Sequence, residues 1–492
     1  MKTPPILQTI SKAITEHAGR AVLVGGAVRD IVMGHDVKDY DIEVFGIGSM
    51  HRLGDILSQF GSVNEVGRSF GILKLRVGEM EYDFALPRKE RKSGRGHRGF
   101  DVEVDGTLSF AEAARRRDFT VNAVGYDLLG GKMLDPYNGL GDIRCRVLRH
   151  IDAETFVEDP LRVYRAVQFA ARFGMEVAEE TAALCKKMVG EGMLEELPKE
   201  RVYLEWQKLL LKASKPSIGF ELMREWGILE RYFPELNALI GVPQDPKWHP
   251  EGDVWVHTMM SIDAMAHLVR SAPDRREKCP WGEERGVRSE KGKLKLLFAV
   301  LCHDLGKPSM TTIEIDQSST EVLHTDTPHS KVRAIGHETA GLEPTRSFMY
   351  RLSDEHDFIE SILPLVEHHL KPSQFYKQGT KSGAIRRLAT KVNIEELVLV
   401  AKADFFGRTT EEAKHGRYKA GEWLLEKAKS LKVHNRPLDN VLRGRDLIAL
   451  GMRPSPKFKK ILDEVYALQM EGKINNREEA LEYLKNKNYN FI

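Results

Sequence analysis

The sequence predicts an α/β domain at the N-terminus, followed by a remainder made almost entirely of helices. Through residues 21–150, strand-like and helix-like segments alternate, whereas from residue 151 onward the pattern turns helical and stays so. Gly25-Gly26 lies between the first predicted strand and the helix that follows it. This strand, turn and helix unit is the third observation that favours an α/β beginning.

The elements of the α/β part follow one another closely. A leading helix is expected within residues 1–20, and Met50–Phe60 fits a second helix because Leu53, Ile56 and Leu57 share one face. The strands expected here are Ala21–Val24, Tyr40–Phe45, Gly71–Val77 and Glu81–Leu86. Later helices include Arg201–Lys212 and Ile218–Tyr232, and polar loops are expected at Ser271–Lys293 and Glu314–Thr327.

Composition places the chain among soluble globular proteins. Of its 492 residues, 41% are hydrophobic and 30% are charged, and no run of about 18 apolar residues predicts a membrane helix. The N-terminus lacks the apolar region of a secretory signal, so a cytoplasmic protein is expected. The four cysteines are scattered without a C-x-x-C, which argues against a disulfide framework and a cysteine zinc site.

Four domains are expected from the changes in pattern along the chain. A proline-rich stretch near Pro243–Pro250 marks one boundary. The expected domains are an α/β head at 1–150, a helical neck and body at 151–245, a histidine-bearing helical domain at 246–430 and a helical tail at 431–492.

The diglycine turn predicts a phosphate site. Glycines lack Cβ atoms, so the N–H groups of Gly25 and Gly26 can approach an anion, and the helix expected at Ala27–Met33 adds its dipole.

Two carboxylates follow on the next strand. Asp39 and Asp41 are two residues apart, so they share a face and can hold Mg²⁺, which prefers oxygen ligands. Asp83, on a neighbouring predicted strand, is a candidate third carboxylate, as metal ligand or general base. The alternative for each is a solvated surface aspartate.

Basic residues gather after the predicted strands. Arg88–Arg98 contains six Lys or Arg and one Glu, which suits phosphate contacts or a solvated flexible loop. In RRRDFTVNA, Arg117 could bind phosphate while Asp118 and Asn122 hold ribose hydroxyls. A capped helix that begins near Asp118 explains much of the same pattern.

The segment EDPLRVYRAVQFAARF predicts a helix with a recognition role at its start. Pro160 suits the first helical position and Asp159 suits the N-cap. Asp159 and Arg162 lie three apart on one face and offer an acceptor beside a donor fork. Such a pair could accept cytosine and adenine and refuse guanine and uracil.

The motifs LVGGAVRD, KDYDIEVF, RRDFTVNA, DPYNGLGDI and EDPLRVYRAVQFAARFG occur in this order within residues 20–175. Together they resemble the class II tRNA nucleotidyltransferase and poly(A) polymerase family. The resemblance implies a polymerase β-like nucleotidyltransferase head, catalytic metals on Asp39 and Asp41, and a base-selecting pair. The implied nucleotide-binding residues are Gly25, Gly26, Arg29, Arg117, Asp118, Asn122, Asp159, Arg162 and Arg165.

Further segments extend the resemblance. LPKERVYLEWQKLL resembles the family's neck motif, which implies helical domains that clamp the acceptor arm of tRNA. Residues 442–484 resemble the ending of bacterial CCA-adding enzymes. ALPRKERKSGRGHRGF resembles a flexible loop that favours full CCA addition over CC-only addition. The continuation DYDIEVFG departs from the usual pattern of this subgroup.

Histidines and aspartates are spread over the helices after residue 250. A single core histidine is usually structural, but here an adjacent His-Asp pair has a histidine before it and an aspartate about a hundred residues later. This arrangement resembles the HD metal-dependent phosphohydrolase superfamily and implies mixed imidazole and carboxylate ligands for divalent metal. The candidate ligands are His257, His303, Asp304, His337, Asp404 and either His368 or His369, with His368 placed in the set.

The predicted function is template-independent addition of CCA to the tRNA 3′ end from CTP and ATP with Mg²⁺. The resemblance implies phosphatase, 2′-nucleotidase and 2′,3′-cyclic phosphodiesterase activities for the HD domain, with a divalent transition metal of unknown identity. The alternatives are a bacterial poly(A) polymerase and, from another class, an HD phosphohydrolase whose head tethers RNA. Neither the oligomeric state nor the HD substrate follows from the sequence.

Overall fold

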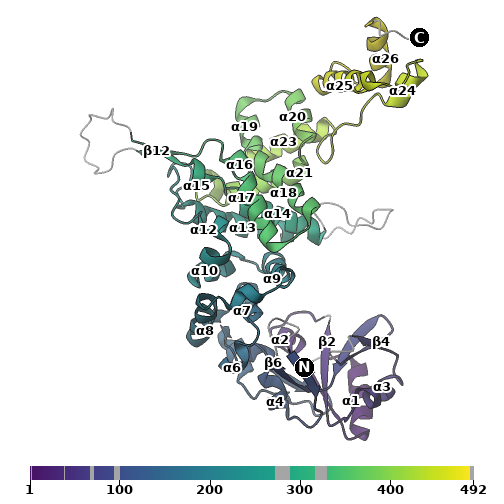
Figure 1. The fold of residues 1–492 in the computed structure, drawn as a ribbon, viewed down its shortest axis with the longest axis vertical. Coiled ribbons are helices and arrows are strands. Elements are labelled where there is room, and N and C mark those ends of the chain that lie inside the picture. The colour runs from purple at the N-terminus through teal and green to yellow at the C-terminus, as the bar shows by residue number, and fades with distance from the viewer. Residues whose placement is uncertain are drawn as a thin grey trace. The chain divides into compact units, whose positions relative to one another are not determined.

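The computed structural model describes residues 1, 3–37, 39–66, 71–92, 100–271, 289–315 and 330–487. The chain divides into two compact units, Met1–Tyr232 and Phe233–Ile492. Figure 1 shows the strands of unit 1 in purple and blue and the helices of unit 2 in teal, green and yellow.

A seven-stranded sheet forms the centre of the head, in the order β3-β4-β5-β2-β1-β8-β9. β2 pairs antiparallel with β1 and parallel with β5. The strands are β1 Arg20–Val24, β2 Tyr40–Phe45, β3 Ser62–Val66, β4 Ile72–Val77, β5 Met80–Ala85, β8 Gly125–Asp127 and β9 Met133–Leu134.

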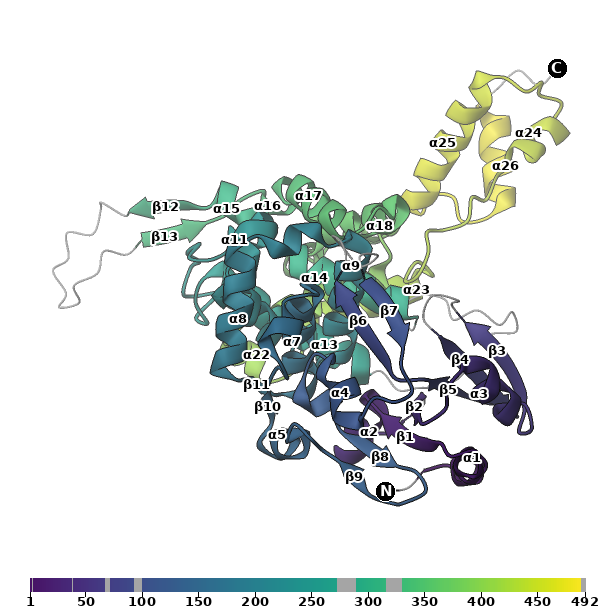
Figure 2. The same ribbon diagram turned by 60° about the horizontal axis from the view of Figure 1, so that its bottom comes forward.

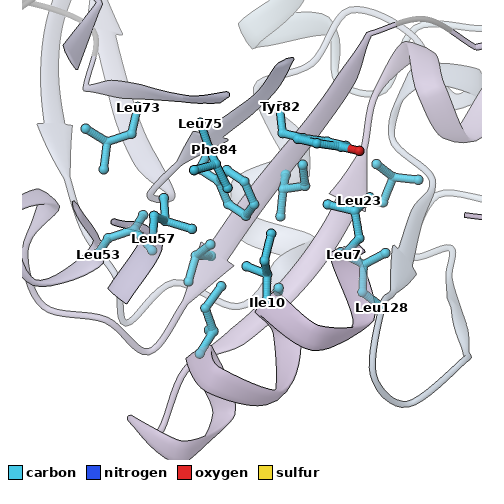
Figure 3. Packing of buried hydrophobic residues seen from close by; sticks show 14 of the residues in the cluster. Leu7, Ile10, Leu23, Leu53, Leu57, Leu73, Leu75, Tyr82, Phe84 and Leu128 are labelled. Carbon is cyan, nitrogen blue, oxygen red and sulfur yellow. The ribbon is translucent and has the colours of Figure 1, made fainter. Parts of the chain in front are cut away.

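One face of this sheet carries the hydrophobic core. Side chains alternate between the two faces of a strand, so Leu23 and Phe84 point to the core face, where α1 (Pro5–Glu16) and α3 (Met50–Leu57) pack. Figure 3 shows Leu7 and Ile10 of α1 near Leu23, with Leu53 and Leu57 of α3 near Leu73 and Leu75.

The opposite face of the sheet carries polar residues and α4 (Phe110–Arg115), which packs on Val22 and Val24. In the register of β1 and β2, Val24 is opposite Asp41 and Val22 is opposite Glu43. The alternation that buries Ile42 and Val44 in the core therefore directs Asp41 and Glu43 to the α4 face.

The basic segment differs from the expected loop. Residues Arg88–Lys92 form strand β6, which pairs antiparallel with β7 (Phe100–Val104), and Figure 2 shows the two strands side by side. Residues 93–99, the rest of the expected loop, lie outside the described residues. Backbone hydrogen bonds define this strand pair, and hydrophobic periodicity did not reveal it.

The remainder of unit 1 is helical apart from a short parallel pair, β10 (Val147–Leu148) and β11 (Glu176–Val177). The helix expected over Ile218–Tyr232 is two helices, because Gly227 has a φ of +78° and ends the first. The other helices of the unit are α2 Gly26–Val32, α5 Gly139–Cys145, α6 Ala153–Phe156, α7 Leu161–Phe173, α8 Glu179–Gly190, α9 Lys199–Lys212, α10 Ser217–Glu225 and α11 Ile228–Tyr232, with 3₁₀ helices at Thr120–Asn122 and Met193–Glu196.

Unit 2 is built from helices and one hairpin. Its helices are α12 Pro234–Asn237, α13 Val254–Ser271, α14 Glu290–Cys302, α15 Lys307–Met310, α16 His337–Ala340, α17 Leu342–Leu352, α18 His356–His368, α19 Lys371–Gln378, α20 Ser382–Ala389, α21 Ile394–Phe406, α22 Glu411–Lys414, α23 Lys419–Ser430, α24 Gly444–Ala449, α25 Pro456–Glu471 and α26 Arg477–Asn486. The polar segment expected at Glu314–Thr327 begins inside strand β12 (Thr312–Ile315), which pairs with β13 (Ser330–Arg333). The last three helices enclose a hydrophobic cluster of their own, which includes Leu447, Ile461 and Leu484. Among the described residues, no helix is both long and apolar enough to cross a membrane.

Candidate active sites

The turn between β1 and α2 brings three of the predicted head residues together. Gly25 has φ +68° and ψ −137°, a conformation that side chains disfavour. A Cβ built on Gly25 would lie 3.0 Å from Nη1 of Arg117 and 3.8 Å from Oδ2 of Asp41. A guanidinium and a carboxylate therefore converge on a bare backbone turn.

The predicted carboxylates lie on adjacent strands. Asp41 of β2 and Asp83 of β5 are directly opposite each other in the parallel register. Burial, then the charges of Asp83, Asp39 and Glu43, raise the pKa of Asp41 above its ordinary value, although Arg117 lowers it. Nζ of Lys74 lies 3.5 Å from Asp83 Oδ1.

Asp39 lies just before β2 and is exposed, whereas Asp41 and Asp83 lie on paired strands. Within the described ranges, every set of three ligand groups whose atoms approach within 4.8 Å lies between His249 and His369, so the head carboxylates do not form such a set.

Glu43 is a residue that the sequence analysis did not single out. It is 3% exposed and accepts hydrogen bonds from Nη2 of Arg116 at 2.8 Å and Nη2 of Arg117 at 3.4 Å. Its i+2 spacing from Asp41 was the available signal, since that spacing puts both on one face.

Four of the predicted nucleotide-binding residues form one hydrogen-bonded chain. Arg29 Nη1 donates to Asn122 Oδ1 at 2.6 Å, and Asn122 Nδ2 donates to Asp118 Oδ1 at 2.8 Å. Asp118 Oδ2 accepts from Arg165 Nε at 2.7 Å. Burial raises the pKa of Asp118, but the charge of Arg165 and the hydrogen bond from Asn122 outweigh it and hold the pKa below its ordinary value.

Two aromatic rings of α7 pack against the arginines of this hydrogen-bonded network. The guanidinium carbon of Arg29 lies 5.2 Å from the ring centroid of Phe169 and 4.4 Å from that of Phe173. That of Arg165 lies 5.1 Å from the centroid of Phe169. The network ties α2, the 3₁₀ helix Thr120–Asn122 and α7 together, so these residues hold one another in place.

The expected base-selecting pair is held by separate partners. Asp159 Oδ2 accepts from Arg201 Nη2 at 3.0 Å, and Asp159 Oδ1 accepts from the N–H of Leu161 at 3.2 Å. Asp159 thus makes the expected bond to the helix start, although Pro160 is the N-cap residue. Arg201 was noted only as part of the neck motif.

Arg162 is fixed by main-chain carbonyls. Its Nη1 donates to the carbonyl of Thr155 at 2.7 Å and its Nη2 to the carbonyl of Arg116 at 2.6 Å. The two members of the pair are therefore oriented independently before any ligand binds.

The second site is a buried cluster in unit 2. Over the described parts of the chain, two of the three groups whose ligand atoms lie within 4.8 Å of one another share Asp304: His257 with His303 and Asp304, and Asp304 with His337 and His369. The third group is His249, Glu251 and His257. Nε2 of His303 lies 3.4 Å from Nε2 of His257, and Nε2 of His337 lies 3.4 Å from Nε2 of His369. Asp304 belongs to the ligand groups of both histidine pairs.

The hydrogen bonds of these histidines indicate a metal centre. Nδ1 of His303, His337 and His369 lies 2.6, 2.6 and 2.7 Å from the carbonyl oxygen three residues earlier. A carbonyl only accepts, so Nδ1 carries the proton and Nε2 keeps its lone pair. Lone pairs that face each other around the carboxylate of Asp304 fit a cation.

Two basic side chains lie against the buried carboxylates of Asp404 and Asp304. Nη2 of Arg408 lies 2.7 Å from Oδ1 of Asp404, which in turn lies 3.1 Å from Nε2 of His257. Lys307 Nζ lies 2.7 Å from Asp304 Oδ2. Burial raises the pKa values of Asp304 and Asp404. The charges of the neighbouring Lys307, Arg408 and histidines outweigh this effect and hold both pKa values well below the ordinary range.

The choice of His368 requires correction. His369, one residue later, enters the cluster, whereas the His368 ring nitrogens have no hydrogen-bond partner among the described residues and belong to none of the ligand groups. Successive helical residues point about 100° apart, so only one of the two can face the site.

Two close contacts explain why distant segments meet at this cluster. A Cβ at Gly306 would lie 2.1 Å from the carbonyl oxygen of His337, so only glycine permits the approach that places His337 beside Asp304. Glu251, which the sequence analysis missed, has its Oε1 2.8 Å from Nδ1 of both His257 and His249. Glu251 thereby orients the ring of the candidate ligand His257 by holding its Nδ1 while its Nε2 faces the cluster.

Three family models match successive parts of the chain. Residues 21–149 match the poly A polymerase head domain, residues 174–240 the probable RNA and SrmB-binding site of polymerase A, and residues 261–408 the HD domain.

Solved structures of similar fold include one described as the Bacillus stearothermophilus CCA-adding enzyme in complex with CTP, at a TM-score of 0.64 and 19% identity, with 99% of this chain and 100% of that chain covered. Another is described as the Thermotoga maritima CCA-adding enzyme complexed with tRNA-CCA, at a TM-score of 0.59 and 20% identity, with 99% and 96% covered. At these identities the similarity shows the fold.

A closer relative in sequence is the multifunctional CCA protein of Acinetobacter baumannii (strain SDF). It is 33% identical over 428 residues, which cover 84% of this chain and 91% of that protein. Identity of this extent over most of both chains shows that this chain belongs to the multifunctional CCA protein family.

Proposed function

We propose that the chain adds C, C and A to the 3′ end of tRNA from CTP and ATP, and that its HD centre hydrolyses phosphates at RNA ends. The observation that carries the first activity is the convergence of Asp41 and Arg117 on the Gly25 turn. The ribose 3′-hydroxyl of the RNA attacks the α-phosphorus of the nucleoside triphosphate. The bond between the α-phosphorus and the oxygen that bridges to the β-phosphate breaks, and pyrophosphate leaves.

In the head, each residue has a separate part in this transfer. The bare Gly25 turn lets phosphate approach the backbone, and Arg117 neutralises phosphate charge. Asp39, Asp41 and Asp83 would hold Mg²⁺, which when bound stabilises the charge that develops on the phosphates. The raised pKa of Asp41 supports this role, because crowded carboxylates are stabilised by a cation.

For base choice, we propose that Asp159 and Arg162 read cytosine and adenine. Asp159 accepts from the exocyclic amine, and the Arg162 guanidinium donates to the ring nitrogen. Arg201 supports this role because it holds Asp159 in one orientation in the free protein. Full CCA addition, rather than CC alone, belongs to the same proposal.

For the HD centre, we propose a ligand set of His257, His303, Asp304, His337, His369 and Asp404. The imidazole-rich set favours a transition metal, and a divalent ion held there activates water for attack on phosphorus. The shared position of Asp304 in both ligand groups supports two ions rather than one. Phosphatase, 2′-nucleotidase and 2′,3′-cyclic phosphodiesterase reactions are the proposed activities.

The four domains at 1–150, 151–245, 246–430 and 431–492 and a cytoplasmic location complete the proposal. The helical cluster after residue 440 supports a separate tail, which would contact tRNA.

One assay tests the transfer. The protein is incubated with tRNA that lacks its last three nucleotides and with each labelled nucleoside triphosphate, separately and together. Addition of two C and one A, followed by a stop, is the expected result. A long run of A would instead indicate a poly(A) polymerase, and CC without A would indicate a CC-adding enzyme.

Paired variants test the division of labour. Asp41→Ala should abolish nucleotide incorporation and spare hydrolysis of 2′,3′-cyclic nucleotides, whereas Asp304→Ala should do the reverse. Loss of both activities in either variant would contradict two independent centres.

A further inference from the structure

Trp248 is an exposed tryptophan of unit 2 to which the proposed chemistry gives no role. We propose that Trp248, with Lys247 and Lys377, forms a stacking platform for the nucleobase of the HD substrate. Hydrolysis of a nucleoside 2′,3′-cyclic phosphate or 2′-phosphate would then depend on the base as well as on the phosphate group. This inference rests on the hydrolase function proposed above.

The exposure of Trp248 sets it apart. It is 47% exposed, whereas Trp206, Trp226 and Trp255 are 0%, 3% and 0% exposed. An indole ring left in water forgoes the free energy that its burial would release, and exposed aromatic rings of this kind mark binding surfaces.

The ring is carried on a fixed turn. The N–H of Lys247 donates to Oδ1 of Asp245 at 2.9 Å, and those of Trp248 and His249 donate to the Asp245 carbonyl at 3.0 and 2.9 Å. The loop is closed where the N–H of Gly241 donates to Asp253 at 2.7 Å. Because the backbone is already ordered, a base that stacks on the ring pays little further entropy.

Two chain segments connect this platform to the metal centre. The residue after Trp248 is His249, whose ring centroid lies 4.6 Å from that of His257. On the other side, Lys377 belongs to α19, which begins two residues after His369. Trp248 is therefore next in the chain to a residue that contacts the candidate ligand His257, and Lys377 lies on the helix that follows His369.

The charges complete the argument for a nucleotide. Nζ of Lys247 and of Lys377 lie 5.3 and 4.9 Å from the Trp248 ring centroid. Within the part of the chain that the structure describes, neither ammonium takes part in an ion pair, so both can meet phosphate. An aromatic ring with adjacent cations is the combination that binds single-stranded RNA, by base stacking and phosphate contact.

The test compares two substrates that differ only in the base, adenosine 2′,3′-cyclic phosphate and methyl ribofuranoside 2,3-cyclic phosphate, with the full-length, metal-loaded protein. The ratio of their kcat/KM values should fall about tenfold in Trp248→Ala, through KM, because stacking contributes that much per base. Trp248→Phe should keep most of the ratio. Tyr350→Ala, a substitution of an exposed aromatic residue on α17, should leave the ratio unchanged.

An unchanged ratio in Trp248→Ala, or an equal loss on both substrates, would overturn the platform. If the wild-type protein hydrolyses neither substrate, the proposed hydrolase function fails, and calorimetric titration with adenosine 2′-phosphate then tests the platform alone. Weaker binding to Trp248→Ala than to wild type supports it, and equal binding overturns it.

Discussion

Glu43 lies two residues after Asp41 on the same face of β2 and accepts hydrogen bonds from Arg116 and Arg117. Its buried carboxylate fixes the direction of Arg117, whose guanidinium packs against the Gly25 turn. The position of Arg117 at the Gly25 turn therefore depends on a residue that the proposed phosphate contacts do not include.

Glu43→Gln keeps the size of the side chain and removes its charge. Hydrogen bonds to charged groups contribute about 1.5–3 kcal/mol, so KM for CTP and ATP should rise about tenfold, with a smaller change in kcat. Steady-state incorporation into tRNA that lacks CCA measures both constants. The exposed Glu81→Gln on β5 is the control, and an equal effect there would contradict a specific role for Glu43.

The free energy of unfolding should depend on pH through the carboxyl group of Asp118. Its pKa in the folded protein lies below the ordinary value of 3.8, so ionised Asp118 adds stability above that value, and the contribution is lost as the pH falls through the folded pKa. Wild type should exceed Asp118→Asn in free energy of unfolding by a constant amount near neutral pH, and the difference should shrink below pH 3.8. Urea unfolding across this range measures it, and a difference that grows in acid would refute the assignment.

Glu251 is expected to tune metal affinity. Its Oε1 lies 2.8 Å from Nδ1 of His257, and removal of such a partner typically lowers metal affinity about 10–100-fold. Glu251→Gln should show this loss in competition with a chelating dye, a readout that needs no turnover. Glu355→Gln, an exposed change in the same unit, should bind metal like wild type.

At the scale of elements, the turn between β1 and α2 depends on a glycine with a positive φ. Gly25→Ala places a side chain at φ +68° and a Cβ 3.0 Å from Arg117. Backbone strain of this kind costs about 1–3 kcal/mol, so nucleotide incorporation should fall about tenfold or more while cyclic-nucleotide hydrolysis persists. Gly26→Ala is the matched control, because its φ is not positive and its closest contact is 3.4 Å, so the loss should be smaller.

Local pattern predicted elements well where one face of the element is buried. The strand expected at Tyr40–Phe45 has those bounds in the structure, because Ile42 and Val44 alternate with polar residues. Local pattern predicted the wrong element where backbone pairing or a left-handed residue determines the structure. Examples are the pair of strands β6 and β7, where a loop was expected, and Gly227, where one continuous helix was expected.

At the scale of the whole molecule, each unit has a candidate centre of its own. The head offers carboxylates, and unit 2 offers mostly imidazoles around Asp304. Hard Mg²⁺ prefers oxygen ligands, whereas imidazole suits transition metals, so the two centres should differ in metal requirement.

Removal of all metal by chelation should abolish both activities. Mg²⁺ alone should then restore nucleotide incorporation but little hydrolysis, and added Ni²⁺, Co²⁺ or Mn²⁺ should restore hydrolysis of 2′,3′-cyclic nucleotides. Asp304→Ala, tested in parallel, should respond to Mg²⁺ in incorporation and to no metal in hydrolysis. Full recovery of hydrolysis by Mg²⁺ alone would contradict the imidazole-rich ligand set.

The sequence by itself determined the α/β head, the helical remainder, the family and most candidate residues, because period-two and helical patterns and short motifs are local properties. Only the tertiary structure decided that His369 rather than His368 enters the metal cluster, that Glu43 and Glu251 support the two sites, and that Asp118, Asn122, Arg29 and Arg165 bind one another. These outcomes depend on which side chains meet across residues far apart in the chain. Such meetings follow from strand register, helix rotation and the close approach at Gly306, none of which local spacing records.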